Sequence, residues 1–315
     1  MTNMVLKALS CIILCFIPVC TNADMEVYEP EEIAHLPWGS SSEAVGLVPG
    51  DNEQEPQGPE AIAVDALGRI YLLDVVNYRV QQYSGKGHLL RSIPLQIAGH
   101  ALCVTDDGML YVLDPFSNHI VQYTLQGEFL EGYTFELSDP LSGDLPVTRI
   151  IQGPGGGIWL GTYRDVYPVK LIPQHTRVGP LRKGIPGETA GTYYVIEEVT
   201  KYRARIVLQD EQGSIRRSLF VDSLDPIASV IFLRTDRSDH TYIVLETFKP
   251  SSDGTIVIEK AVRKFNPNGE VIAHFEVPLS YTYCYGGDVA VAEDGTVYHL
   301  WTQRDGVHLI RWHTR

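Results

Sequence analysis

Residues 58–83 read GPEAIAVDALGRIYLLDVVNYRVQQY, and residues 98–123 repeat the pattern as AGHALCVTDDGMLYVLDPFSNHIVQY. Several identities recur forty positions apart, including Gly68 and Gly108, Tyr71 and Tyr111, Asp74 and Asp114, and Gln82 and Gln122. A fixed period of roughly 20–50 residues is typical of stacked supersecondary units. The sequence therefore predicts a repeat architecture.

Each copy consists of short apolar runs separated by turns that contain glycine and aspartate. In the first copy these runs cover 61–64, 69–73, 77–83 and 88–93. Strands of this length joined by such turns are typical of four-stranded antiparallel blades. Weaker copies predict four further blades at about 149–160, 193–221, 228–275 and 288–312. The expected fold is all-β, a six-bladed β-propeller, which lies within the range of blade numbers that such rings allow.

The sixth expected blade shows only three strands before Arg315. An unpaired outer strand is an aggregation hazard, so another segment is expected to cover it. We expect this strand from the N-terminal segment 24–57, with 44–48 as its most strand-like part, followed by an acidic linker. Residues 58–315 then form a single propeller domain, closed from both ends of the chain.

The stretches 58–65, 68–74 and 77–83 closely resemble an NHL repeat, and the second copy keeps its pattern at 118–123. The resemblance covers the first two repeats and part of the sixth. It implies a β-propeller, often six-bladed, of a family whose members are mostly binding and scaffold modules. A fold-level resemblance implies an architecture and not a reaction.

The first 23 residues resemble an export signal. Lys7 is their only charge, residues 8–19 form an apolar core, and small residues at 21–23 precede a polar start. An apolar core of this length is too short to cross a bilayer as a helix, so no transmembrane span is expected. We expect a periplasmic or extracellular protein. Lipid anchoring at Cys20 is less favoured, because Val19 is bulky where a small residue is expected.

The remaining chain contains two cysteines, Cys103 and Cys284, which fall in different repeats and are expected to stay unpaired thiols. The net charge of −14 argues against a nucleic-acid partner, because such partners require a basic face. The sequence has no Gly-x-Ser-x-Gly motif, which removes support for α/β-hydrolase chemistry. Partners are therefore expected to be a protein or a small molecule.

Polar residues are expected where the innermost strands begin, next to the central channel. A ligand pocket needs a few such groups that converge. A solvated rim without a ligand is the alternative explanation. The predicted ligand-binding residues are Glu60, His100, Arg149, Ser229 and Asp288.

Three of these residues, Glu60, His100 and Asp288, are also candidates for binding a divalent cation, calcium or zinc. Propeller lactonases that resemble regucalcin and propeller amidating lyases hold a metal in the central channel. However, the chain lacks close-spaced histidine pairs, and its blade starts lack the Asn-Gly and Pro-Asp-Gly stretches expected of the lactonase group. No cofactor is firmly predicted.

The leading functional prediction is an exported, non-catalytic binding or scaffold module. The alternative is a metal-dependent hydrolase or lyase whose site lies in the channel, with Arg149 orienting an anionic group. A purely structural envelope protein is a third hypothesis. Tyr281, Tyr283 and Tyr285 offer an aromatic surface for a sugar or peptide, although aromatic side chains also pack between blades.

Overall fold

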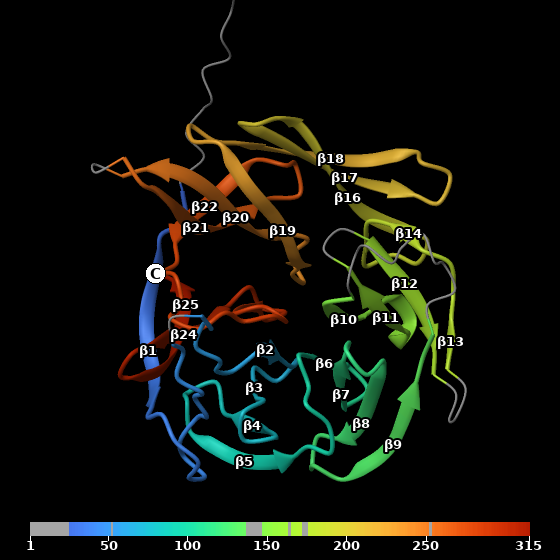
Figure 1. Ribbon diagram of the computed structural model, residues 1–315. Helices are drawn as coiled ribbons and strands as arrows, with labels where there is room; N and C mark the ends of the chain where they lie inside the picture. Colours follow the sequence, from blue (N-terminus) through green and yellow to red (C-terminus); the bar gives the residue numbers. More distant parts are fainter. Residues whose placement is uncertain (1–24, 52, 137–146, 163–164, 172–175, 252–253) are drawn as a thin grey trace, which may run out of the picture.

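The computed structural model describes residues 25–51, 53–136, 147–162, 165–171, 176–251 and 254–315. Six antiparallel sheets are arranged in a ring around a central axis (Figure 1). This confirms the predicted six-bladed propeller. In the described ranges, no helix is long and apolar enough to cross a membrane. The predicted export signal and Cys20 lie outside the described residues.

The first two blades follow the sequence repeat directly. Blade 1 contains β2 (Ala61–Val64), β3 (Ile70–Asp74), β4 (Arg79–Tyr83) and β5 (Leu89–Pro94). Blade 2 contains β6 (Ala101–Val104), β7 (Met109–Asp114), β8 (His119–Thr124) and β9 (Phe129–Thr134). In both blades the strands pair in chain order from the channel outward.

The next three blades keep this order although their sequences depart from the repeat. Blade 3 contains β10 (Arg149–Gln152), β11 (Ile158–Gly161), β12 (Asp165–Lys170), β13 (Arg177–Val178) and β14 (Arg182–Lys183), with a 3-10 turn, η2 (Pro154–Gly156). Blade 4 contains β15 (Ile185–Pro186), β16 (Thr192–Thr200), β17 (Arg203–Asp210) and β18 (Ile215–Asp222). Blade 5 contains β19 (Ile227–Thr235), β20 (Thr241–Pro250), β21 (Ile256–Phe265) and β22 (Val271–Glu276).

Both ends of the chain build blade 6. Its inner strands are β23 (Val289–Val291), β24 (Val297–Gln303) and β25 (Gly306–Thr314), and its outer strand is β1 (Tyr28–Leu36). β1 runs antiparallel to β25, from the pair Tyr28 and Thr314 to the pair Leu36 and Val307. Closure of the ring by the N-terminal segment is thus confirmed.

The closing strand lies at 28–36 and not at 44–48, as the sequence pattern had favoured. Residues 44–48 contribute only isolated bridges, between Trp38 and Val45 and between Val48 and Gln57. β1 has the sequence YEPEEIAHL, in which mainly the two end residues are buried. Charged side chains and proline are tolerated on a strand that faces solvent at a sheet edge, so its apolar pattern is weak.

The repeated tyrosine and glutamine of the sequence form buried hydrogen bonds inside the blades. In blade 1, the hydroxyl of Tyr71 donates to Asp65 at 3.1 Å and accepts from Nε2 of Gln82 at 2.6 Å. In blade 2, Gln122 donates to Tyr111 at 2.9 Å. Burial raises the pKa of Tyr71 to about 12, with a further contribution from the Asp65 carboxylate. These residues recur because each blade must satisfy the same buried polar groups.

The repeated aspartates are structural in the same way. Asp74 is fully buried and accepts from Nε of Arg79 at 2.7 Å, while Arg79 also donates to the backbone carbonyls of Ser41 and Ala44. Asp114 accepts from the backbone N–H of Phe116 within its own turn. The ion pair of Asp74 and Arg79 therefore holds the N-terminal segment against blade 1.

Candidate functional site

Glu60 and His100 occupy equivalent places in blades 1 and 2. Each directly precedes the innermost strand of its blade, and its backbone N–H donates to the second strand, Glu60 to Leu73 at 3.0 Å and His100 to Leu113 at 2.8 Å. Oε1 of Glu60 lies 3.8 Å from Nδ1 of His100, while Oε2 accepts from the backbone N–H of Tyr285 at 3.0 Å. The structure thus brings two predicted residues together as a carboxylate and an imidazole, separated by slightly more than a hydrogen-bond distance.

Aromatic rings surround this pair. The His100 ring meets Phe116 and Tyr285 edge-on, with centroid distances of 4.9 and 5.8 Å, and Tyr283 follows at 6.4 Å from Tyr285. Phe116 is 71% exposed and Tyr283 is 69% exposed. Burial and the neighbouring carboxylates raise the pKa of Tyr283. The rings present an open apolar surface beside a carboxylate.

Asp288 is held in an ion pair between two blades. Its carboxylate pairs with Nζ of Lys260 from β21, and Nε2 of the buried His299 lies 3.7 Å away. Burial opposes ionisation, but His299 and Lys260 outweigh it and keep the pKa of Asp288 well below its usual value. Asp288 therefore connects blade 6 to blade 5.

The other two predicted residues lie within their strands, not before them. Ser229 is the third residue of β19, and its hydroxyl donates to Glu246 at 2.6 Å. Arg149 begins β10 and donates from Nη2 to the carbonyl of Phe232 at 3.2 Å. Burial lowers the pKa of Arg149 below its ordinary value.

Arg149 lines a central cavity of about 740 Å³ that runs between the innermost strands. Arg234, from β19, lines the same cavity and donates to the carbonyl of Val291 at 3.2 Å. Ligand pockets typically measure roughly 300–1,000 Å³. The lining also contains five carboxylates. Asp65 pairs with Arg69, and Glu293 pairs with Arg237. Asp106 accepts from Nε2 of Gln152, Asp107 accepts from the hydroxyl of Thr105, and Glu188 also lines the cavity.

Gly286 connects the Glu60 backbone to the cavity. This residue lines the cavity, and its backbone N–H donates to the carbonyl of Glu60 at 2.8 Å. A Cβ atom at Gly286 would lie 2.7 Å from the backbone oxygen of His100, so the close packing requires glycine. The backbones of Glu60 and His100 therefore contact a residue of the cavity wall, although neither residue lines the cavity itself.

The three residues considered for a metal do not form a common ligand set. Within the described part of the chain, one group of three acidic, histidine or cysteine side chains has its ligand atoms within 4.8 Å of one another, and this group contains His35, Asp305 and His308 instead. Asp288 is also committed to Lys260. Glu60, His100 and Asp288 thus do not fit a shared cation.

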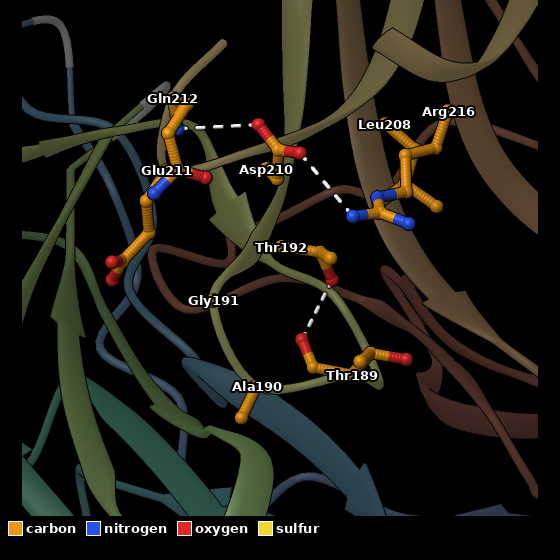
Figure 2. Close-up of a pocket in the computed structure, with 9 residues that line it drawn as sticks. All are labelled: Thr189, Ala190, Gly191, Thr192, Leu208, Asp210, Glu211, Gln212 and Arg216. Atoms are coloured by element: carbon orange, nitrogen blue, oxygen red, sulfur yellow. Dashed lines mark hydrogen bonds and ion pairs between the residues drawn. The ribbon is translucent and has the colours of Figure 1, made fainter. Parts of the chain in front are cut away.

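A smaller hollow of about 380 Å³ lies at the hairpin ends of blade 4. Figure 2 shows Asp210 and Arg216 facing each other on one side and Thr192 facing Thr189 on the other. Arg216 lies 3.2 Å from Asp210, so its charge is already paired. The central cavity is the stronger candidate site.

Sequence reasoning missed Phe116, Arg234 and Lys260. Arg234 and Lys260 are basic residues inside strands, where a charged side chain is informative only once the facing blade is known. Phe116 lies in a turn and gave no periodic signal. Trp301 and Trp312, which lie near the tyrosines in sequence, pack elsewhere, against His308 and Phe275.

No family model matches the chain, and no curated protein matches its sequence. Among solved structures, a DUF4221 family member from Bacteroides vulgatus aligns with a TM-score of 0.51 and 13% identity, over 93% of this chain and 99% of that chain. A protein provisionally named a gluconolactonase aligns with a TM-score of 0.50 and 13% identity, over 93% and 94%. Virginiamycin B lyase from Staphylococcus aureus aligns with a TM-score of 0.46 and 14% identity, over 90% and 99%. At these identities the first two alignments establish the fold, a six-bladed β-propeller, while the resemblance of its repeats to NHL sequences stays a prediction.

Proposed function

We propose that the protein is a propeller hydrolase or lyase that acts, in its central channel, on a small ligand that carries or develops negative charge. The observation that carries this proposal is the pair of arginines in the cavity. Arg149 and Arg234 each donate to one backbone carbonyl, and neither has a carboxylate within ion-pair distance among the described residues. A guanidinium has five N–H donors, so several remain for a ligand oxygen.

The Glu60–His100 pair supplies the group that moves a proton. When Glu60 closes to hydrogen-bond distance of Nδ1 in the ligand complex, it orients the imidazole, which then accepts a proton from water through Nε2. In ester or lactone hydrolysis, negative charge develops on the carbonyl oxygen, and guanidinium donors stabilise that charge. The backbone hydrogen bond from Gly286, which lines the cavity, to Glu60 supports this division of roles.

The similarity of the fold to solved propellers indicates which substrate to test first. One fold neighbour is provisionally named a gluconolactonase, which makes a lactone the first substrate to test. Hydrolysis of a lactone yields a carboxylate, an anion suited to the two arginines. Because Glu60, His100 and Asp288 do not gather around one point, no step is assigned to a metal ion.

A non-catalytic binding module is the second candidate. It is favoured by the exposed rings of Phe116 and Tyr283 beside Glu60. Such a surface suits stacking against a sugar or an apolar ligand. This candidate predicts binding without turnover.

Calorimetry with gluconate, citrate and inorganic phosphate, together with proton release from glucono-1,5-lactone, separates the two candidates. Arg149→Gln should weaken anion binding about tenfold, the loss of one charge-assisted contact. His100→Gln should lower turnover about 100-fold while binding changes little. Arg91→Gln, on the exposed outer strand of blade 1, is the control. Anion binding that Arg149→Gln leaves unchanged contradicts the proposal, and binding without turnover supports the second candidate.

A further inference from the structure

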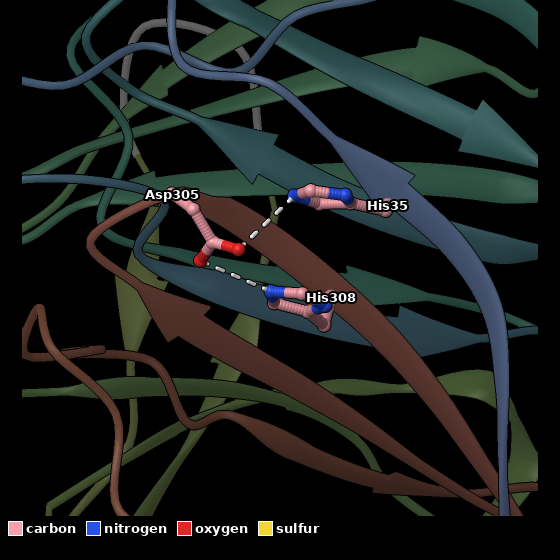
Figure 3. Close-up of side chains that lie close together, drawn as sticks. All are labelled: His35, Asp305 and His308. Carbon is pink, nitrogen blue, oxygen red and sulfur yellow. Dashed lines mark hydrogen bonds and ion pairs between the residues drawn. The ribbon is translucent and has the colours of Figure 1, made fainter.

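A cluster of two histidines and an aspartate lies on blade 6, at the junction between the two ends of the chain. His35 belongs to β1 and His308 belongs to β25, and the two residues are directly paired across the strands. Asp305 lies in the turn between β24 and β25. Figure 3 shows the Asp305 carboxylate facing both imidazole rings. The cluster belongs to the outer part of the blade and plays no part in the proposed chemistry.

The ligand atoms of the cluster lie close enough for one ion to bind them once the ring of His35 rotates. Nε2 of His35 is 3.9 Å from Oδ2 of Asp305, and Nε2 of His308 is 3.4 Å from Oδ1. Zinc bonds of roughly 2.0–2.2 Å bring two ligand atoms to about 3.3 Å from each other. The side chains of His35 and Asp305 are 44% and 66% exposed, so both are free to move by this amount.

The surroundings of His308 suit a metal ion as well as a protonated imidazole between two carboxylates. Its Nδ1 lies 3.1 Å from Oε2 of Glu32, and its Nε2 faces Asp305. A neutral imidazole carries one N–H, so it can donate to only one of these two carboxylates. Metal-bound histidines commonly donate the other ring N–H to a carboxylate, which here is Glu32. Nε2 then keeps its lone pair for an ion beside Asp305.

Local packing holds the two rings together on one side of the sheet. The rings of His35 and His308 stack with centroids 4.4 Å apart and planes inclined by 8°, and Trp301 packs against His308 at 5.1 Å. A shared ion must lie in both ring planes, so the exposed ring of His35 must rotate about χ2, while the buried ring of His308 keeps its contacts to Glu32 and Asp305. Gly306 leaves room for His35, because a Cβ atom there would lie 2.8 Å from Nε2.

We propose that His35, His308 and Asp305 bind a zinc ion that fastens the N-terminal strand β1 to the C-terminal strand β25. Two imidazoles and one carboxylate form a donor set that suits zinc, with water as the fourth ligand. Because the ligands come from opposite ends of the chain, only the closed ring brings them together. Zinc therefore stabilises the closed propeller over any state in which β1 is detached.

The test is a zinc titration of the full chain after treatment with EDTA and dialysis, by calorimetry and by thermal melting. We expect one zinc ion per chain from this cluster. At a zinc concentration of 100 times Kd, the melting temperature should rise by about 5 °C. Cobalt substituted for zinc should show the visible absorption of a tetrahedral ion.

Matched variants assign the site. His35→Gln and Asp305→Asn should each abolish the zinc-dependent rise in melting temperature, and both positions are exposed enough to keep the fold. Glu32→Gln should weaken zinc binding about 10- to 100-fold. His119→Gln, which changes a histidine of blade 2, should leave zinc binding unchanged. Zinc binding that survives His35→Gln, or a wild-type chain that binds no zinc, overturns the proposal. Because the variants spare the channel, their outcome does not depend on the proposed hydrolase or lyase activity.

Discussion

Blades 1 and 6 are neighbours in the ring and are built in opposite ways. Blade 1 takes its four strands from one continuous stretch, and Asp74 and Arg79 form a buried ion pair within it. Blade 6 takes its outer strand from 28–36 and its other strands from 289–314. Local contacts stabilise the first blade, whereas the second depends on pairing between distant parts of the chain. The two blades should therefore respond differently to truncation, substitution and acid.

The largest effect should follow from removal of β1. A chain that begins at residue 37 loses the partner of β25, together with Tyr28 and Leu36, which are 8% and 7% exposed. Two such buried side chains contribute at least about 5 kcal/mol, a large part of the roughly 5–15 kcal/mol by which proteins are stable. Urea unfolding should show a much lower midpoint or no cooperative transition. A chain that begins at residue 25 is the control, and equal midpoints for the two would show that β1 does not close the ring.

The second effect tests the local stability of blade 1. Asp74→Asn leaves the guanidinium of Arg79 buried without its carboxylate, which should cost about 3–5 kcal/mol of unfolding free energy. The equivalent change in blade 2, Asp114→Asn, affects a partly exposed turn and should cost about 1 kcal/mol or less. If both variants lose a similar amount of unfolding free energy, the buried Asp74–Arg79 ion pair contributes no more stability than the turn of blade 2. Urea unfolding at pH 7 provides the measurement.

The contrast between the blades also explains how far the sequence could predict the fold. In blade 1, local turns and the Tyr71–Gln82 hydrogen bond impose a sequence pattern that repeats in blade 2. The strands of both blades could therefore be predicted from the sequence. In blade 6, a missing strand pointed to the N-terminal segment but not to 28–36. An edge strand has one solvent-exposed side, so its composition resembles a loop.

The candidate site was predictable only in part. Glu60 and His100 could be found because equivalent positions in a repeat lie at the same level of the ring. For Asp288 and Arg149, the neighbouring groups come from other blades: Lys260 from β21 pairs with Asp288, and Arg234 from β19 shares the cavity with Arg149. Contacts between blades depend on the width and twist of the ring, which the sequence of a single repeat does not specify.

The third effect concerns acid and the ion pair of blade 6. The folded-state pKa of Asp288 is lowered, so its ionised form contributes stability above the unfolded pKa of about 3.9. That contribution is lost as the pH falls from about 5 toward the folded-state pKa. Asp288→Asn should cost about 3 kcal/mol at pH 7, because Lys260 loses its partner, and the variant should then lose less stability on acidification. Urea unfolding at pH 7, 5 and 3 measures both quantities. Parallel pH profiles for the two proteins would show that Asp288 is a solvated channel residue and not a brace.

The smallest effect compares one tyrosine position in both blades. Tyr71 near the start of β3 donates to Asp65 and accepts from Gln82, and both contacts are buried. Tyr298 occupies the equivalent place in β24, and its hydroxyl has no hydrogen-bond partner among the described residues. Tyr71→Phe leaves the buried amide of Gln82 without its acceptor, while Asp65 keeps its bond from Arg69, and should cost about 1–2 kcal/mol. Tyr298→Phe should change the unfolding free energy by less than about 0.5 kcal/mol. If both variants lose the same amount in urea unfolding, ring packing and not the hydroxyl explains why tyrosine recurs, and the polar network that distinguishes blade 1 from blade 6 would contribute little.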